Sequence, residues 1–203
     1  MKKKVVSFLV SGRGSNFKTV AEKILSGYIP ATPGIVLSNK NGAKALETAE
    51  KMGIPSLAVL PADYGNREAH EEALIRELER HNTDLVVAAG YMRILTSHFV
   101  KHFENRIINI HPALLPAFPG VDAQQQAFDY GVKVTGCTAH FIDEGTDTGP
   151  IILQQPVPVH NDDTVESLSK RILVEEHRVL PEAVKLFCEG RLKVKGRHVY
   201  IRG

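Results

Sequence analysis

Three polar side chains in the second half of the chain are of types that together can catalyse proton transfer around a carbonyl group. Asn109 and His111 lie at the end of the apolar stretch 106–110, and Asp147 lies in the glycine-containing stretch 143–150. Because alternate side chains of a strand share a face, Asn109 and His111 should project together where this strand ends. An amide beside an imidazole can hold an oxyanion and move a proton, and a carboxylate favours the charged imidazole. The spacing therefore predicts a catalytic group made of these three residues.

Simpler structural explanations exist for two of these residues. His111 alone would be read as a strand-end histidine bonded to the backbone, and Asp147 as a turn residue that stabilises its own loop. The pairing of His111 with Asn109, followed by Pro112, favours catalysis. No metal cofactor is expected, because the histidines form no clear ligand pair with a cysteine or carboxylate at helical spacing. The histidines considered are His98, His102, His111 and His140.

Four separated stretches resemble the folate-dependent formyltransferase family in their residues and in their order. They are Ser11–Asn16, Gly90–Leu95, Asn109–Pro116 and Asp143–Pro150. The resemblance runs from the first strand to the helix near Glu176. It implies transfer of the formyl group of 10-formyltetrahydrofolate, used as a cosubstrate, to the primary amine of glycinamide ribonucleotide in purine biosynthesis.

The chemistry that this reaction demands suggests, as a hypothesis, a role for each residue of the catalytic group. Asn109 would donate to the oxyanion of a tetrahedral intermediate. His111, protonated and held by Asp147, would be a second donor and the acid. Asp147 would help to remove the proton of the attacking amine. We expect direct transfer, without a covalent acyl-enzyme.

The glycine-containing turn 12–16 separates the first predicted strand from the first predicted helix. Backbone N–H groups at a helix N-terminus bind anions, but Phe17 stands where a dinucleotide fingerprint needs its third glycine. The pattern alone favours a phosphate monoester site and a simple turn equally. The resemblance implies that Gly14, Ser15 and Asn16 bind the ribonucleotide phosphate. It also implies that Glu176, otherwise a solvated helix carboxylate, binds the ribose.

The segment Gly90–Leu95 follows a buried strand, at the carboxyl end where open α/β sheets bind ligands. On sequence alone, an ordinary connection with Met92 and Leu95 facing the core is the better interpretation. The resemblance implies instead that this segment and the 143–147 loop contact the pterin ring. The folate-binding residues it implies are Arg67, Met92, Arg93, Ile94, Leu95, Asn109, His140 and Asp143.

Strand-like and helix-like patterns alternate along the chain. Predicted strands cover 5–10, 34–38, 57–60, 84–90, 106–110, 135–142 and 151–159. Predicted helices cover 17–25, 43–52, 66–81 with Asn66 as N-cap, 97–103, 123–130 and 164–188, the last with a potential break near Pro181; a hairpin of 192–194 and 199–201 follows. This order predicts an α/β, Rossmann-like open twisted sheet, mostly parallel but mixed, with helices on both faces.

The 203 residues predict a single domain, or a large one with a small appendage. The resemblance implies one formyltransferase domain, 1–203, with a ribonucleotide-binding half at 1–100 and a catalytic and folate-binding half at 101–203. A net charge of +2 favours small-molecule substrates over nucleic acid or a membrane. The sequence shows no membrane span or signal peptide, and Cys137 and Cys188 read as two buried reduced thiols. We therefore expect a cytoplasmic protein, and the sequence leaves open whether it forms a homodimer.

Two other functions remain as alternatives. A formyltetrahydrofolate deformylase resembles the chain at the same Asn, His and Asp positions but uses water as the acceptor, and Pro112 favours the transferase. A non-enzymatic module that binds a phosphorylated metabolite would need only the glycine-containing turn. That interpretation leaves Asn109, His111 and Asp147 without a common purpose.

Overall fold

The computed structural model describes residues 3–203, and the chain divides into two compact units, Met1–Ile108 and Asn109–Gly203. Each unit has its own strands and helices and is described by itself. Strand β5 (Ile107–His111) supplies the last two residues of the first unit and the first three of the second. None of the helices in 3–203 is long and apolar enough to cross a membrane.

The first unit contains four parallel strands in the order β3-β2-β1-β4. Their bounds are β1 Lys4–Val10, β2 Ala31–Ser38, β3 Ser56–Ala58 and β4 Leu85–Ala88. β1 has buried residues on both faces, from Val6 to Val10, as expected for a central parallel strand. The order places the carboxyl ends of β1, β2 and β4 at one edge of this sheet, where the glycine-containing turn begins.

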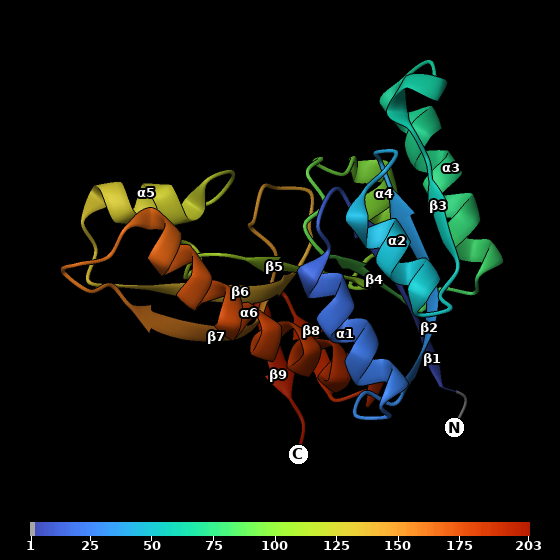
Figure 1. The fold of residues 1–203 in the computed structure, drawn as a ribbon. Helices are drawn as coiled ribbons and strands as arrows, with labels where there is room; N and C mark the ends of the chain where they lie inside the picture. The colour runs from blue at the N-terminus through green and yellow to red at the C-terminus, as the bar shows by residue number, and fades with distance from the viewer. Residues whose placement is uncertain (1–2) are drawn as a thin grey trace. The chain divides into compact units, whose positions relative to one another are not determined.

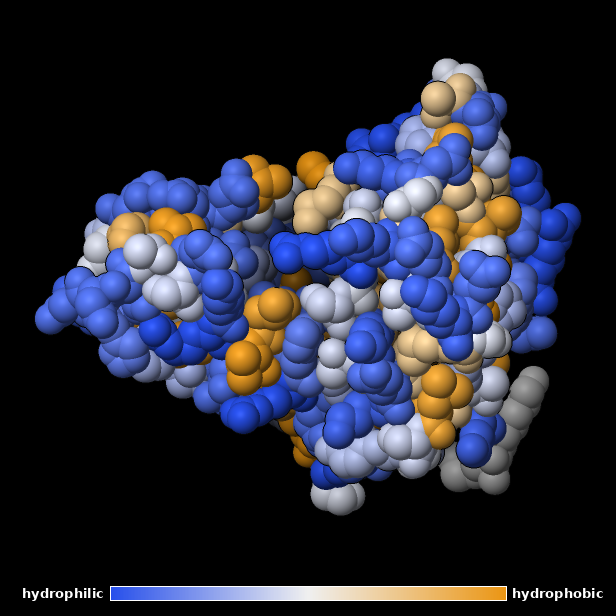
Figure 2. All heavy atoms as spheres, in the orientation of Figure 1, coloured by the Kyte–Doolittle hydropathy of each residue, from blue (hydrophilic) through white to orange (hydrophobic). Residues whose placement is uncertain are grey.

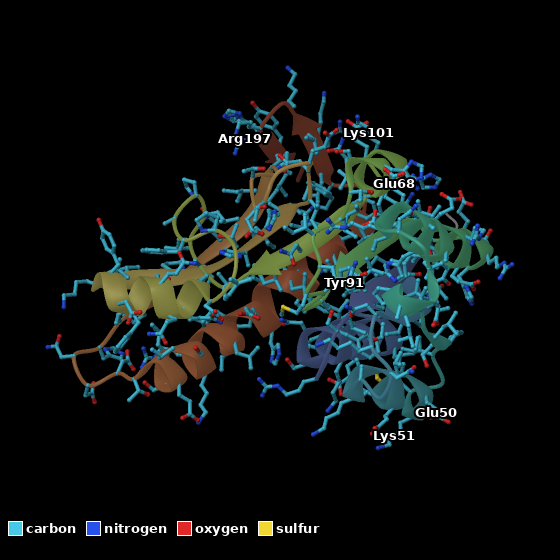
Figure 3. The ribbon with its side chains drawn as sticks, turned by 90° about the horizontal axis from the view of Figure 1, so that it is seen from above. Glu50, Lys51, Glu68, Tyr91, Lys101 and Arg197 are labelled. Carbon is cyan, nitrogen blue, oxygen red and sulfur yellow. The ribbon has the colours of Figure 1, made fainter. Side chains whose placement is uncertain are left out.

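Helices cover both faces of the first unit's strands. They are α1 Ser15–Leu25, α2 Lys44–Lys51, α3 Arg67–Arg80 and α4 Ser97–His102, with a 3-10 turn, η1, at Pro61–Asp63. In Figures 1 and 3, α1 and α2 lie on one face, and α3 and α4 on the other; the labelled Lys51 and Glu68 point to opposite sides. The predicted N-cap of α3 is confirmed, because Ala69 N donates to Asn66 Oδ1 at 2.8 Å.

The second unit has a mixed sheet in the order β6-β7-β9-β8. β6 (Val134–Phe141) and β7 (Ile151–Pro158) are antiparallel, β7 and β9 (His198–Ile201) parallel, and β9 and β8 (Leu192–Lys195) antiparallel. α5 (Ala123–Tyr130) and α6 (Val165–Cys188) lie side by side over β6 and β7 (Figure 1). Their outer surface is mostly hydrophilic, with small apolar groups between polar side chains (Figure 2).

The predicted α/β fold with a mostly parallel, mixed sheet is confirmed, and the differences are local. β2 begins at Ala31 rather than residue 34, because its register shifts opposite Val6–Phe8 and so accommodates Pro33 and Gly34. A Cβ on Gly34 would lie 2.3 Å from Ser7 Oγ, and that hydroxyl accepts a hydrogen bond from Ile35 N at 3.2 Å. η1 was not predicted.

Two further expectations are corrected by the second unit. The potential break near Pro181 is absent, since α6 continues through this residue from Val165 to Cys188. Of the two cysteines, Cys137 is buried as expected, whereas Cys188 is only partly buried; neither forms a disulfide bond.

Candidate active site

The chain that follows β5 is held against β6 and β7 by side-chain hydrogen bonds. Thr138 Oγ1 donates to Ala113 O at 2.7 Å and accepts from Leu115 N at 3.0 Å. Gln154 Nε2 donates to Leu115 O at 2.8 Å. These buried and half-buried hydrogen bonds fix the backbone directly after His111. The direction in which the imidazole projects from the end of β5 is therefore defined.

His111 lies between two hydrogen-bond acceptors. Its Nδ1 is 3.3 Å from Asp147 Oδ2, and its Nε2 is 2.7 Å from Phe118 O. A neutral imidazole carries a single N–H, whereas the charged form donates from both nitrogens. The residue is also 97% buried, with 3% of its surface exposed, so water does not compete for these partners. Each ring nitrogen of His111 therefore faces an acceptor in a buried setting.

The carboxylate of Asp147 points out of its own loop and toward His111. It adopts a left-handed backbone conformation with φ 54°, and its Oδ2 also accepts from Gly120 N at 2.8 Å. The loop itself is stabilised by another residue, because Asp143 Oδ1 accepts from Gly145 N at 3.1 Å and from Thr148 Oγ1 at 2.6 Å. The interpretation of Asp147 as a residue that only stabilises its turn is therefore wrong.

Asn109 and His140 complete a cluster of four polar side chains. Asn109 Nδ2 lies 3.2 Å from His140 Nε2, which is 3.7 Å from Asp147 Oδ1. His140 is 1% exposed, and this burial lowers the pKa of its imidazole from the ordinary value of 6.5. The structure thus brings Asn109, His111, His140 and Asp147 together in the second unit.

Glu176 of α6 is not the solvated helix carboxylate that the simpler interpretation assumed. Only 7% of the residue is exposed. Burial first, and then the charge of Glu176, raise the pKa of the Cys137 thiol on β6 to about 12. Carboxylates are rarely buried without a partner or a function.

The glycine-containing turn in the first unit is constrained by close packing. Gly14 has φ 72°, and a Cβ there would lie 2.5 Å from the Cβ of Ala45 at the start of α2. Ala45 N also donates to Gly12 O at 3.1 Å. Gly14 is therefore required by the turn itself. Ser15 and Asn16, half-buried, begin α1, whose first turn carries no acidic side chain.

The segment after β4 exposes apolar side chains. Met92 is 71% exposed and Ile94 60%, whereas Leu95 is 8% exposed. The interpretation that Met92 faces the core is wrong. Large exposed apolar side chains on a short connection are typical of a binding surface. Tyr91, labelled in Figure 3, is partly buried, and burial is the main cause that raises its pKa to about 12.

Side chains from two other elements hold this segment. Ser11 Oγ, at the end of β1, accepts from Met92 N at 2.8 Å and donates to Asn39 Oδ1 at 2.6 Å. Arg67 of α3 donates to Ile94 O. The guanidinium of Arg67 therefore lies at this segment.

Glu71 of α3 is a buried residue that the sequence did not single out. Its carboxylate accepts hydrogen bonds from Thr96 N at 3.1 Å and from Thr96 Oγ1, and it lies 3.6 Å from Arg67 Nε. Its side chain is 3% exposed. No signal marked it, because α3 contains several acidic residues and only the fold shows which one is buried.

The histidines of α4 are paired with carboxylates of α3. His98 Nε2 is 3.1 Å from Glu72 Oε2, and His102 Nε2 is 3.0 Å from Glu79 Oε1. Within residues 3–203, no group of three or more His, Cys, Asp or Glu side chains is arranged to hold a metal ion.

Comparisons with known proteins agree on one family. A family model for formyl transferase matches residues 3–184. The chain is 43% identical to phosphoribosylglycinamide formyltransferase of Bacillus subtilis over 90% of this chain and 93% of that protein. It is 44% identical, over 96% of its length, to the trifunctional purine biosynthetic protein adenosine-3 of Chironomus tentans, but spans only 14% of that protein. The solved structure of glycinamide ribonucleotide transformylase 1 from Symbiobacterium toebii has a TM-score of 0.97 at 48% identity, and the match covers 99% of this chain and 95% of that one.

Proposed function

This chain belongs to the formyl transferase family, and on that premise we propose that it transfers a formyl group from 10-formyltetrahydrofolate to the amine of phosphoribosylglycinamide in purine biosynthesis. The observation that carries the proposal is the buried imidazole of His111, held between Asp147 and Phe118 O, beside the amide of Asn109. The family match at 3–184 runs through both units, so we propose that they serve one formyltransferase domain.

The proposed reaction needs one proton removed from the attacking amine and one proton delivered to the folate nitrogen. The amine nitrogen attacks the formyl carbon, a new N–C bond forms, and the carbonyl oxygen becomes an oxyanion that Asn109 and protonated His111 stabilise. The amine loses a proton, which Asp147 accepts directly or through water. The bond from the formyl carbon to the folate nitrogen then breaks, and that nitrogen receives a proton from His111. The products are the formylated amine and tetrahydrofolate.

The family assigns the substrates to further residues, and parts of the structure support that assignment. Buried Glu176 suits the ribose hydroxyls, and the start of α1 at Gly14, Ser15 and Asn16 suits the phosphate. A second set of residues is proposed to bind the folate. It consists of Arg67, Met92, Arg93, Ile94, Leu95, Asn109, His140 and Asp143. In this set, the exposed apolar side chains of Met92 and Ile94 suit a flat heteroaromatic ring.

The carboxylate of Asp143 is already engaged by Gly145 N and Thr148 Oγ1. We therefore propose that it shapes the folate-facing loop.

Both substrates are charged, water-soluble metabolites, so the proposal includes a cytoplasmic location and small molecules as the partners.

Formation of tetrahydrofolate from 10-formyltetrahydrofolate, measured with and without phosphoribosylglycinamide, tests the proposal. We expect turnover to depend on the amine and the formylated amine to appear in equal amount. Equal turnover without the amine would instead identify a hydrolase. Absence of turnover with both substrates would leave only a binding module.

A further inference from the structure

His140 is the one member of the four-residue cluster to which the proposed reaction assigns no proton or charge. It lies on β6, and only 1% of the residue is exposed. Both of its ring nitrogens have partners at hydrogen-bond distance. Nδ1 is 2.8 Å from Phe141 O, and Nε2 is 3.2 Å from Asn109 Nδ2.

These two partners determine which nitrogen of His140 carries the proton. A carbonyl oxygen only accepts, so Nδ1 must be the N–H group. In the neutral ring, Nε2 is then a lone pair that accepts a hydrogen bond. Because an amide NH₂ donates and an amide oxygen does not, the lone pair at Nε2 requires the nitrogen end of the Asn109 amide to face it.

The charged groups around His140 act in opposite directions. Asp147 Oδ1 lies 3.7 Å from Nε2, and Asp147 and the more distant Asp143 favour the charged ring. The charge of His111 disfavours it, and burial disfavours it most. The sum lowers the pKa of His140, so the neutral ring is the resting form.

We propose that His140 is a positioning residue that fixes the orientation of the Asn109 amide. The lone pair on Nε2 accepts one N–H of Asn109, which holds the amide so that its second N–H remains available to the oxyanion. This inference rests on the proposed function for the role of Asn109, but the His140 tautomer is a property of the protein alone.

The same geometry specifies what protonation of His140 would do. A charged ring carries N–H groups at both nitrogens, and the Nε2–H group would then require the oxygen of the Asn109 amide. The Asn109 amide would flip, and its N–H donor would no longer point toward the oxyanion. Turnover should therefore fall as the pH decreases through the lowered pKa of His140.

Nitrogen-15 NMR of the uniformly labelled protein tests the tautomer without any substrate. We expect His140 to show a protonated Nδ1 and an unprotonated Nε2 at neutral pH. A ring protonated at Nε2, or at both nitrogens, would overturn the inference. Because this readout does not depend on turnover, it stays decisive even if the protein shows no formyl transfer.

Substitutions test the positioning role in the active enzyme. His140→Gln keeps an acceptor oxygen on a side chain that does not titrate, whereas His140→Leu removes the acceptor. His140→Leu should lower kcat roughly tenfold to a hundredfold, less than the loss of a whole oxyanion donor. His140→Gln should retain most of the activity. Its pH profile of turnover should lack the decrease at low pH, the acidic limb, that is attributed to His140. His160→Gln, at an exposed histidine, is the matched control.

A double variant separates positioning from independent action. If His140 acts through Asn109, His140→Leu should cost almost nothing further in an Asn109→Ala background. Fully additive losses would overturn the proposal. An acidic limb that stays unchanged in folded, active His140→Gln would overturn it as well.

Discussion

The two residues that flank the His111 imidazole are positioned by unusual local backbone. Asp147 has φ 54°, and Phe118, whose carbonyl oxygen faces Nε2, also has φ 54°. Left-handed backbone is uncommon for residues other than glycine and is most often tolerated by Asn and Asp. At Asp147 this conformation turns the carboxylate out of its loop, where it meets both His111 and Gly120 N. The strained backbone at Asp147 thus places its carboxylate beside His111.

Asn109→Ala should reduce turnover about a hundredfold to a thousandfold, because one oxyanion donor is lost. The loss should appear mainly in kcat, since the donor acts most strongly in the transition state. Steady-state kinetics measure this effect, and thermal unfolding checks that the fold is intact. Asn161→Ala, at an exposed position, is the control. A variant with near-normal kcat would show that Asn109 does not hold the oxyanion.

The segment from Gly90 to Leu95 has no regular secondary structure, and other elements therefore determine its shape. Ser11 at the end of β1 holds Met92 N, and Arg67 on α3 holds Ile94 O. Glu71 holds both Arg67 and the backbone at Thr96. A segment held by side chains from a strand and a helix can present exposed apolar groups without collapsing onto the core.

Glu71→Gln should raise the KM for the folate substrate with little change in kcat. Gln keeps one acceptor for Thr96 but loses the charge that holds Arg67, and a buried charged hydrogen bond contributes about 1.5–3 kcal/mol. An increase in KM of roughly tenfold is therefore expected. The measurement is KM for folate at saturating acceptor. Glu68→Gln changes an exposed carboxylate of the same helix, labelled in Figure 3, and should leave KM as it was.

At the scale of the whole molecule, charge is nearly balanced at +2, so stability depends on individual buried groups more than on net charge. His140 is one such group, with a pKa lowered by burial from 6.5. Below pH 6.5, His140 binds a proton more readily in the unfolded chain than in the folded protein. The stabilisation is fully present above the unfolded pKa and is lost as the pH falls below it.

The free energy of unfolding should therefore decrease as the pH is lowered below 6.5, the ordinary value for this group. One proton taken up only by the unfolded chain gives a slope of at most about 1.4 kcal/mol per pH unit. Urea unfolding between about pH 7.5 and 5 measures it. His140→Gln should show a shallower slope than the parent protein and than His160→Gln. Equal slopes in all three would mean that His140 does not stay neutral in the folded state.

Local pattern was sufficient for the order of the elements. The apolar runs of β1 and β5, the helical periodicity along α6 and the N-cap Asn66 all depend on residues close in the chain, so a single sequence carries them. The same reasoning placed Asn109 and His111 on one side of a strand end. It left β2 too short, because the register shift that accommodates Pro33 depends on β1 as a partner.

The sequence by itself determined the fold class and the chemical types of the three residues proposed to be catalytic. Only the tertiary structure decided which partners those groups have. Asp147 could have stabilised its own turn, Glu176 could have been solvated, and Met92 could have faced the core, because each choice depends on burial by distant segments. The pairing of His140 with Asn109 is of the same kind, since hydrogen bonds across 31 residues of separation follow from sheet geometry and not from spacing.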